Sequence, residues 1–190
     1  MLADWDHCFP NCEPIGHHLR VAFAERWVRF HSLPVSKRYP ENDAEHAEVL
    51  ARHNAILGEL IHPGAHVVLV TTGYSGSSVP MRSYPEVIAY DPGAVSWRTV
   101  AMHRVDEGFE EPSYWHLFAS VREWWPGEFD PLVRLVAEDA IANVLVVAPD
   151  CRWALHPYDG GTDVISESPD ARRLLRAKHV AWLSARGDGL

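Results

Sequence analysis

This 190-residue chain lacks several features that would assign it to a class at once. No run of residues approaches the roughly 18 consecutive apolar positions that a membrane-spanning helix needs, so we expect no membrane span. The first residues, Met1 to Asp6, carry acid and no basic stretch, which argues against a signal peptide and favours the cytoplasm. Cysteine is scarce, with only Cys8, Cys12 and Cys151, so we expect free thiols rather than a disulfide framework.

Basic residues are outnumbered as well. The chain has 17 Lys and Arg against 26 Asp and Glu, a formal net charge of -9. Nucleic-acid binding needs a basic surface, so this balance excludes nucleic acid as the main partner. The acidic residues are scattered rather than gathered in runs. They suit either an ordinary solvated surface or attraction to a basic protein partner.

The motifs that mark nucleotide cofactors and serine nucleophiles are missing too. Residues 73 to 80 are rich in Gly and Ser, but they contain neither the Gly-Lys-Ser/Thr of a P-loop nor a dinucleotide fingerprint. Gly73-Tyr74-Ser75-Gly76 is one residue short of the Gly-x-Ser-x-Gly nucleophile elbow. This stretch therefore predicts a flexible loop, and we expect no cofactor.

The patterns that are present predict a mixed fold. The clearest helix covers residues 43 to 61, where Asn42 can cap the first turn and Glu45 follows three residues later. A second helix, over residues 130 to 142, opens with Asp130-Pro131, and a last helix begins after Ser168 and ends near residue 187. Strands are predicted at residues 26–33, 66–72, 96–103, 114–121, 143–148, 151–156 and 163–166.

Strands outnumber helices and many connections between them are short. This order predicts the α+β class, with a largely antiparallel sheet of five to seven strands and helices packed on a face. The length suits a single domain over residues 1–190. Residues 1–18, punctuated by Pro10, Pro14 and Gly16, are predicted to be an irregular N-terminal segment.

Residues 150 to 165 carry the densest group of chemically useful side chains. We expect two strands joined by a tight Gly160-Gly161 turn, a kind of position where functional groups are displayed. The catalytic candidates are His156, Asp159 and Asp163, because two carboxylates near one histidine can move protons or hold a hard cation. The alternative is ordinary turn chemistry, in which Asp caps the turn and Gly supplies a positive φ.

A second group of polar side chains follows the first predicted strand. His31, Lys37, Arg38 and Tyr39 could bind a carboxylate or phosphate, with the arginine fork bidentate. The alternative is a solvated loop whose cations pair with local acids. The ligand-binding candidates are therefore these four residues together with two from the 150–165 stretch, Trp153 and Tyr158.

Histidines and cysteines near the start of the chain raise the question of a metal. Cys8, Cys12, His17 and His18 lie within a dozen residues, and zinc binds four such ligands in a tetrahedron. The Cys-x3-Cys spacing is not diagnostic and the histidines are adjacent, so we predict no metal site. The 12 histidines are spread along the whole chain, and His53 and His116 lie in apolar patterns typical of hydrogen-bonded core residues.

The end of the chain resembles the C-terminal module of a bacterial family of unknown function. The resemblance rests on the octapeptide from Tyr158 to Ile165 and on a closing helix with a late Trp182. That family shows a Tyr-Asp-Asp-Arg-Gly-x-Asp-Val-Ile turn, whereas this chain has Gly160-Gly161 in place of Asp-Arg-Gly and so lacks the arginine. Residues 26 to 39 are also similar to relatives. The resemblance implies a bacterial, intracellular, single-domain protein without an assigned activity.

Two hypotheses for function remain open. The preferred one is an acidic domain that binds a protein partner without catalysis, for example an immunity protein that neutralises a toxin. It is favoured by the acidic balance, the missing catalytic motifs and the eight tryptophans, since interface anchors tend to be aromatic. The alternative is a metal-assisted or acid–base hydrolase with its site at His156, Asp159 and Asp163.

Overall fold

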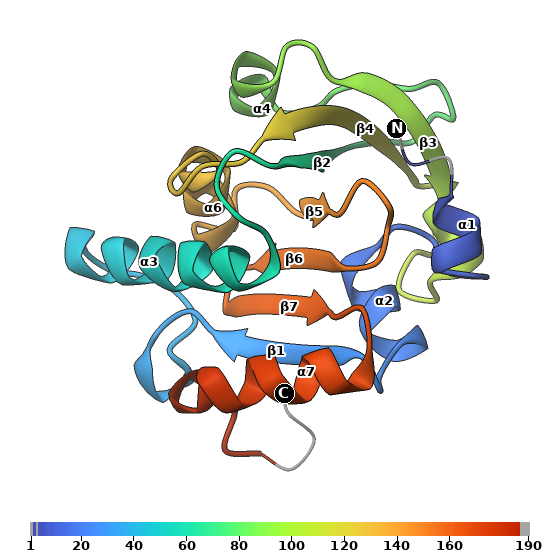
Figure 1. Cartoon of the computed structure of the whole chain (residues 1–190). Helices are drawn as coiled ribbons and strands as arrows, with labels where there is room; N and C mark the ends of the chain where they lie inside the picture. The colour runs from blue at the N-terminus through green and yellow to red at the C-terminus, as the bar shows by residue number, and fades with distance from the viewer. Residues whose placement is uncertain (1, 3, 187–190) are drawn as a thin grey trace.

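The computed structural model describes residue 2 and residues 4 to 186. Its strands form one seven-stranded sheet in the order β1-β7-β6-β5-β2-β4-β3 (Figure 1). Every neighbouring pair is antiparallel, which confirms the predicted α+β class. The strands are β1 (Trp27–His31), β2 (His66–Ser75), β3 (Val95–Ala101), β4 (Tyr114–Glu123), β5 (Leu145–Val147), β6 (Ala154–Tyr158) and β7 (Gly161–Ile165).

The longest helices begin where their capping residues predict. The Asn42 side chain accepts a hydrogen bond from the Glu45 amide at 3.0 Å, and Ser168 accepts one from the Ala171 amide at 3.1 Å. The helices are α1 (Trp5–Cys8), α2 (Gly16–Ala22), α3 (Asp43–Leu60), α4 (Pro85–Tyr90), α5 (Met102–Val105), α6 (Asp130–Ala137) and α7 (Pro169–Lys178). Short 3₁₀ turns cover Pro34–Ser36 and Val180–Trp182.

Both faces of the sheet are buried, each in its own apolar core. Along β2, Val67 and Leu69 join the core beneath α3 and α6, whereas Val68 and Val70 join a core on the opposite face. Figure 1 shows α3 and α7 in front of the sheet. The opposite core is closed by side chains from the N-terminal segment: Trp5, Phe9, Ile15 and Leu19.

The prediction of an irregular segment at residues 1–18 is wrong for two parts of it, Trp5–Cys8 and the residues from Gly16 on. That segment contains α1 and the first turn of α2, and it buries Trp5 and Phe9 almost completely. Its helices have four and seven residues, too few for an apolar periodicity to be visible in the sequence.

Several predicted boundaries also move. The helix expected over residues 130–142 ends at Ala137, because Asp139 adopts a positive φ angle of 56°. The strand expected from Cys151 begins at Ala154, since Cys151 lies in a turn with φ of 57°. The final helix ends at Lys178 rather than near residue 187, which is outside the described residues. β2 extends to Ser75, into the predicted loop.

The short strand β5 shapes the part of the fold where the candidate site lies. β5 has three residues, whereas its neighbour β2 has ten. At the start of β5, its two neighbours β2 and β6 both extend beyond Leu145. Residues 138 to 144, which lead into β5, lie between these extended parts of β2 and β6. Among the described residues, no helix combines the length and the apolar character that crossing a membrane requires.

Candidate functional site

The β6–β7 hairpin carries the residues that the sequence singles out. Tyr158 pairs with Gly161, so the turn itself is formed by Asp159 and Gly160. Neither of its glycines adopts a positive φ, so the expected reason for glycine is wrong. The reason is space: a Cβ on Gly161 would lie 2.3 Å from the Phe30 carbonyl oxygen and 2.8 Å from the Tyr158 hydroxyl. Glycine lets β1 and the Tyr158 ring pack closely against the hairpin.

Asp163 lies in one row with Arg29 and His156 across the three strands β1, β7 and β6. The Arg29 guanidinium donates from Nε to Oδ1 at 2.7 Å and from Nη2 to Oδ2 at 2.8 Å, a bidentate pair. Asp163 is 3% exposed, and Arg29 also lies over the Tyr158 ring, 4.3 Å from its centroid. Both carboxylate oxygens are therefore engaged and neutralised inside the protein.

Asp159 pairs with an arginine from a distant segment, and this arginine is largely exposed. Arg38 donates from Nε to its Oδ2 at 2.6 Å, and the Tyr39 hydroxyl donates to the same oxygen at 2.9 Å. That hydrogen bond to Asp159 is the main cause of a raised pKa for Tyr39. The structure thus brings two of the predicted ligand-binding residues to the predicted turn. Lys37 turns away instead, with its Nζ 2.7 Å from Glu45.

His156 is held as a neutral ring. A Cβ on Gly16 would lie 2.3 Å from this ring, so α2 begins directly on the imidazole. Its Nδ1 is buried and has no hydrogen-bond partner among the described residues. Burial lowers the pKa of His156 to about 4, although the nearby Asp163 opposes the shift. The ring also stacks on Tyr158, with centroids 6.5 Å apart.

These residues border a cavity of about 200 Å³ at the end of the short strand β5. Aromatic rings line it from α2, β4 and β6: His17, Trp115, His156 and Tyr158. Charged groups at the same cavity are Asp139, Asp159 and Arg38. We refer to these seven residues as the cage. Predicted site residues from two distant segments, Arg38 and the hairpin, thus meet at one cavity.

Asn143 fixes the position of α2 above the cage. Its Oδ1 accepts a hydrogen bond from the Gly16 amide at 3.0 Å, and its Nδ2 donates to the Pro14 carbonyl at 3.1 Å. The same Nδ2 donates to Thr72 Oγ1 at 2.9 Å. One buried side chain therefore ties the start of α2 to β2 and places His17 at the cage.

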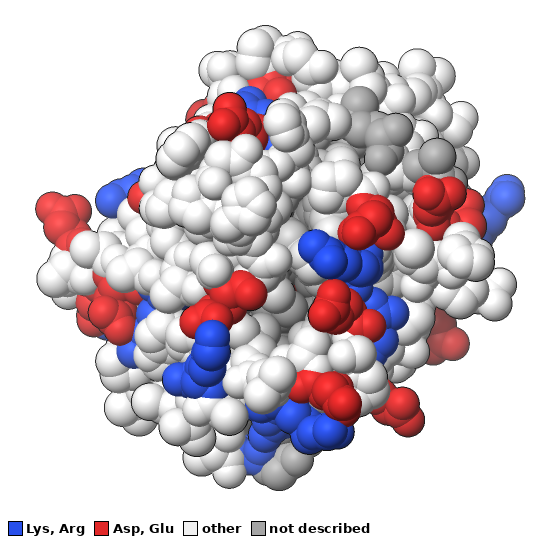
Figure 2. All heavy atoms as spheres, viewed as in Figure 1, with Lys and Arg blue, Asp and Glu red and all other residues white. Residues whose placement is uncertain are grey.

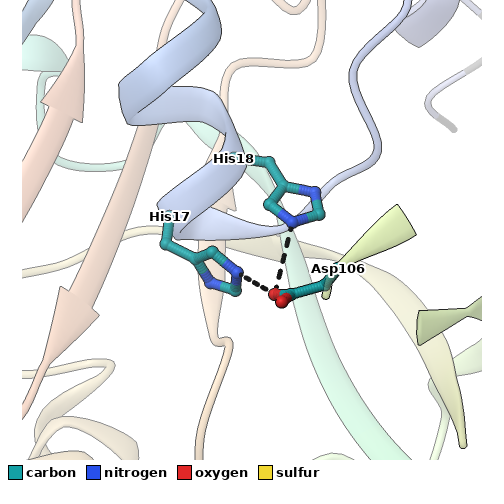
Figure 3. A group of neighbouring side chains, drawn as sticks. All are labelled: His17, His18 and Asp106. Atoms are coloured by element: carbon teal, nitrogen blue, oxygen red, sulfur yellow. Dashed lines mark hydrogen bonds and ion pairs between the residues drawn. The ribbon is translucent and has the colours of Figure 1, made fainter. Parts of the chain in front are cut away.

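His17 also belongs to a cluster at the edge of the cage, shown in Figure 3. Its Nε2 lies 2.8 Å from Asp106 Oδ2, and His18 Nε2 lies 3.6 Å from the same oxygen. The Gly108 amide and His17 hold the pKa of Asp106 below its usual value. Burial, and next the neighbouring His17, lower the pKa of His18.

Neither cysteine of the N-terminal segment joins that cluster. The Cys8 Sγ lies 3.5 Å from the Asp150 carbonyl oxygen, and the Cys12 Sγ lies 3.5 Å from that of Glu13. Burial raises the pKa of Cys12 to about 11, so its thiol stays protonated. The grouping of Cys8 and Cys12 with the two histidines, which was considered from the sequence, does not form.

The other candidate residues lie elsewhere. His31 is on β1, and its buried Nε2 has no partner in the described part of the chain. Trp153 is 3% exposed and borders two surface hollows near α3, of about 450 and 580 Å³, away from the cage. His116 is fully buried between Ser75 Oγ at 2.9 Å and Thr99 Oγ1 at 3.2 Å, as a hydrogen-bonded core residue.

Sequence reasoning missed four residues that build the site: Arg29, Asp106, Trp115 and Asn143. Arg29 had a detectable signal, because a charged residue inside an apolar strand requires a partner on a neighbouring strand. Asp106, Trp115 and Asn143 had none. Their contacts span 71 to 129 positions along the chain, and no local pattern reports such distances.

A protein-family model described as "Domain of unknown function (DUF3885)" matches residues 15–187. The match agrees with the expected relationship to a family of unknown function. No curated protein and no solved structure matches the chain significantly.

Proposed function

Since the chain belongs to this DUF3885 family, whose description states no activity, we propose a function from its own geometry. The protein binds a basic protein partner, and a Lys or Arg side chain of that partner enters the cage. The observation that carries this proposal is one cavity that joins aromatic rings to carboxylates.

The lining of the cage suits a cationic side chain. Trp115 supplies an aromatic ring, on which an ammonium or guanidinium group is stabilised by about 0.5–2 kcal/mol, and the Tyr158 ring, over which Arg29 already lies, borders the same cavity. Asp139 and Asp159 add negative charge, which Arg38 offsets only in part. The volume of about 200 Å³ also fits, because a cavity of about 150 Å³ holds a benzene-sized group.

The charge of the whole chain supports the same class of partner. A net charge of -9 steers basic proteins toward the molecule over a longer range than any single contact. Figure 2 shows acidic and basic side chains interspersed over the face that carries α3 and α7, with no block of one sign. Specificity is therefore better assigned to the cage than to a charged patch on that face.

The state of the hairpin favours binding over acid–base hydrolysis. A hydrolase centred on His156, Asp159 and Asp163 needs a carboxylate or an imidazole free to exchange protons. Here Asp163 is bound by Arg29, Asp159 is bound by Arg38 and Tyr39, and His156 has a pKa of about 4. We therefore assign these residues to holding the cage in shape.

Calorimetric titration with two small probes tests the proposal. Nα-acetyl-arginine amide mimics the partner's side chain, and the citrulline analogue has nearly the same shape without the charge. We expect the arginine probe to bind more tightly than the citrulline probe. The Trp115→Leu variant should weaken arginine binding by about 2- to 30-fold, the equivalent of a cation–π contact.

Matched variants serve as controls. Trp125 is 53% exposed and does not line the cage, so Trp125→Leu should bind the arginine probe as the wild type does. Asp139→Asn should weaken binding, whereas Asp170→Asn, on α7, should not. Equal affinity for the two probes, or equal effects of Trp115→Leu and Trp125→Leu, would show that the cage is not a cation site.

A further inference from the structure

Two segments far apart in the chain bring three metal-binding side chains together beside the cage. His17 and His18 are neighbours in the first turn of α2, and Asp106 caps the C-terminal end of α5. One ligand atom from each residue lies within 4.8 Å of the other two. Figure 3 shows both imidazole rings turned toward the Asp106 carboxylate.

The donor set has the composition of a transition-metal site. Zinc binds histidine nitrogen and carboxylate oxygen at about 2.0–2.2 Å, and its catalytic sites keep three protein ligands and one open position. Magnesium and calcium prefer oxygen ligands alone, so two imidazoles argue against them. The side chains of His18 and Asp106 are 22% and 23% exposed, so an ion can reach them from solvent.

The arrangement is already close to the bound geometry. Asn143 fixes the start of α2 through the Gly16 amide, and the Gly108 amide donates to Asp106 Oδ1 at 2.9 Å. The hydrogen bond to Gly108 leaves Oδ2, the oxygen that faces both histidines, as the ligand atom. Hydrogen bonds of this kind, which orient the ligand side chains from outside, are typical of metal sites.

We propose that His17, His18 and Asp106 bind one Zn²⁺ ion, with a fourth coordination position open beside the cage. His17 both belongs to the cluster and lines the cage, so the ion lies beside the cage. The ion joins the N-terminal segment to the loop after α5, and this proposal does not depend on the cation-binding function.

Zinc titration of the full, chelator-stripped chain tests this proposal. We expect calorimetry and elemental analysis to give one zinc per chain. Co²⁺ in place of zinc should give the visible absorption of a tetrahedral site. His18→Gln and Asp106→Asn should each weaken zinc binding by at least about tenfold, since even the loss of a group that orients a ligand costs about 10- to 100-fold. Asp106→Asn keeps an oxygen that can accept from Gly108, so the turn should persist, and circular dichroism verifies folding.

The chain offers a matched control in His62 and His66, two exposed histidines outside the cluster. The double variant His62→Ala/His66→Ala should retain the wild-type zinc affinity. Zinc binding that is lost in this double variant but kept in His18→Gln would overturn the proposal, because the ion would then belong to surface histidines. A stripped wild-type chain that takes up no zinc on titration would overturn it as well.

Discussion

Two histidines with strongly lowered pKa values, His53 and His156, should make this protein sensitive to mild acid. His53 on α3 is 2% exposed, its Nδ1 is 3.4 Å from Thr162 Oγ1, and its Nε2 has no partner among the described residues. Burial lowers the pKa of His53 to about 4, and burial also lowers that of His156 to about 4. In the unfolded chain the pKa of both rings should lie near 6.5, the ordinary value for histidine.

The direction in which stability changes with pH follows from proton binding. Between pH 6.5 and about 4 the unfolded chain binds more protons than the native one, so stability falls as the pH falls through this window. Going from about pH 7.5 to about pH 5.5 should cost about 1.3 kcal/mol for each ring, or about 2.6 kcal/mol together. Most carboxylates remain ionised at about pH 5.5 in both states, so the histidines dominate the change.

Urea unfolding followed by tryptophan fluorescence at both pH values measures this loss. His53→Leu places an apolar side chain of similar size in the core and removes one titrating ring. The free energy of unfolding of this variant should therefore fall by about 1.3 kcal/mol less than that of the wild type between the two pH values. The exposed His62→Ala variant should keep the full loss. The same pH dependence in wild type and His53→Leu would refute the reasoning, because His53 would then not be buried as a neutral ring.

Three further predictions concern the hairpin and the thiols. Asp163→Asn should lower the free energy of unfolding by about 3–5 kcal/mol, since it leaves the buried Arg29 guanidinium without its counter-charge; chemical denaturation measures this, and a loss below about 1 kcal/mol would contradict it. Gly161→Ala should destabilise the chain despite its ordinary φ, because the new methyl group meets the Phe30 carbonyl at 2.3 Å; a melting temperature at or above wild type would count against that packing. Cys12 should resist alkylation in the native state and react on unfolding, since its pKa is about 11. Mass spectrometry of iodoacetamide-treated protein measures this, and rapid modification of Cys12 in the native protein would contradict it.

Local signals in the sequence predict much of this fold. The caps at Asn42 and Ser168 locate the starts of α3 and α7, and apolar runs locate the strands. Local signals did not predict the end of a helix where tertiary contacts determine the backbone conformation. Asp139 breaks the predicted helix through a positive φ angle, which aspartate tolerates but does not require.

The candidate site was predictable only in part. The sequence identified Arg38, Tyr39 and the hairpin as separate groups, and the structure joins them through Asp159. Asp106 was missed because its partner His17 lies 89 positions away along the chain, whereas Arg29 was missed although its place in an apolar strand was a signal. The glycine pair was assigned to turn conformation, although what Gly161 provides is room for its neighbours.

The central claim is that the cage takes a basic side chain, and nuclear magnetic resonance can test this contact directly. We would titrate the protein with ¹³C-labelled Nα-acetyl-arginine amide and measure nuclear Overhauser effects from its methylene protons. The account predicts effects to the ring protons of Trp115 and Tyr158, which line the cavity. Contacts found only at the exposed Trp125, or no contact with any aromatic ring at a saturating concentration, would contradict it.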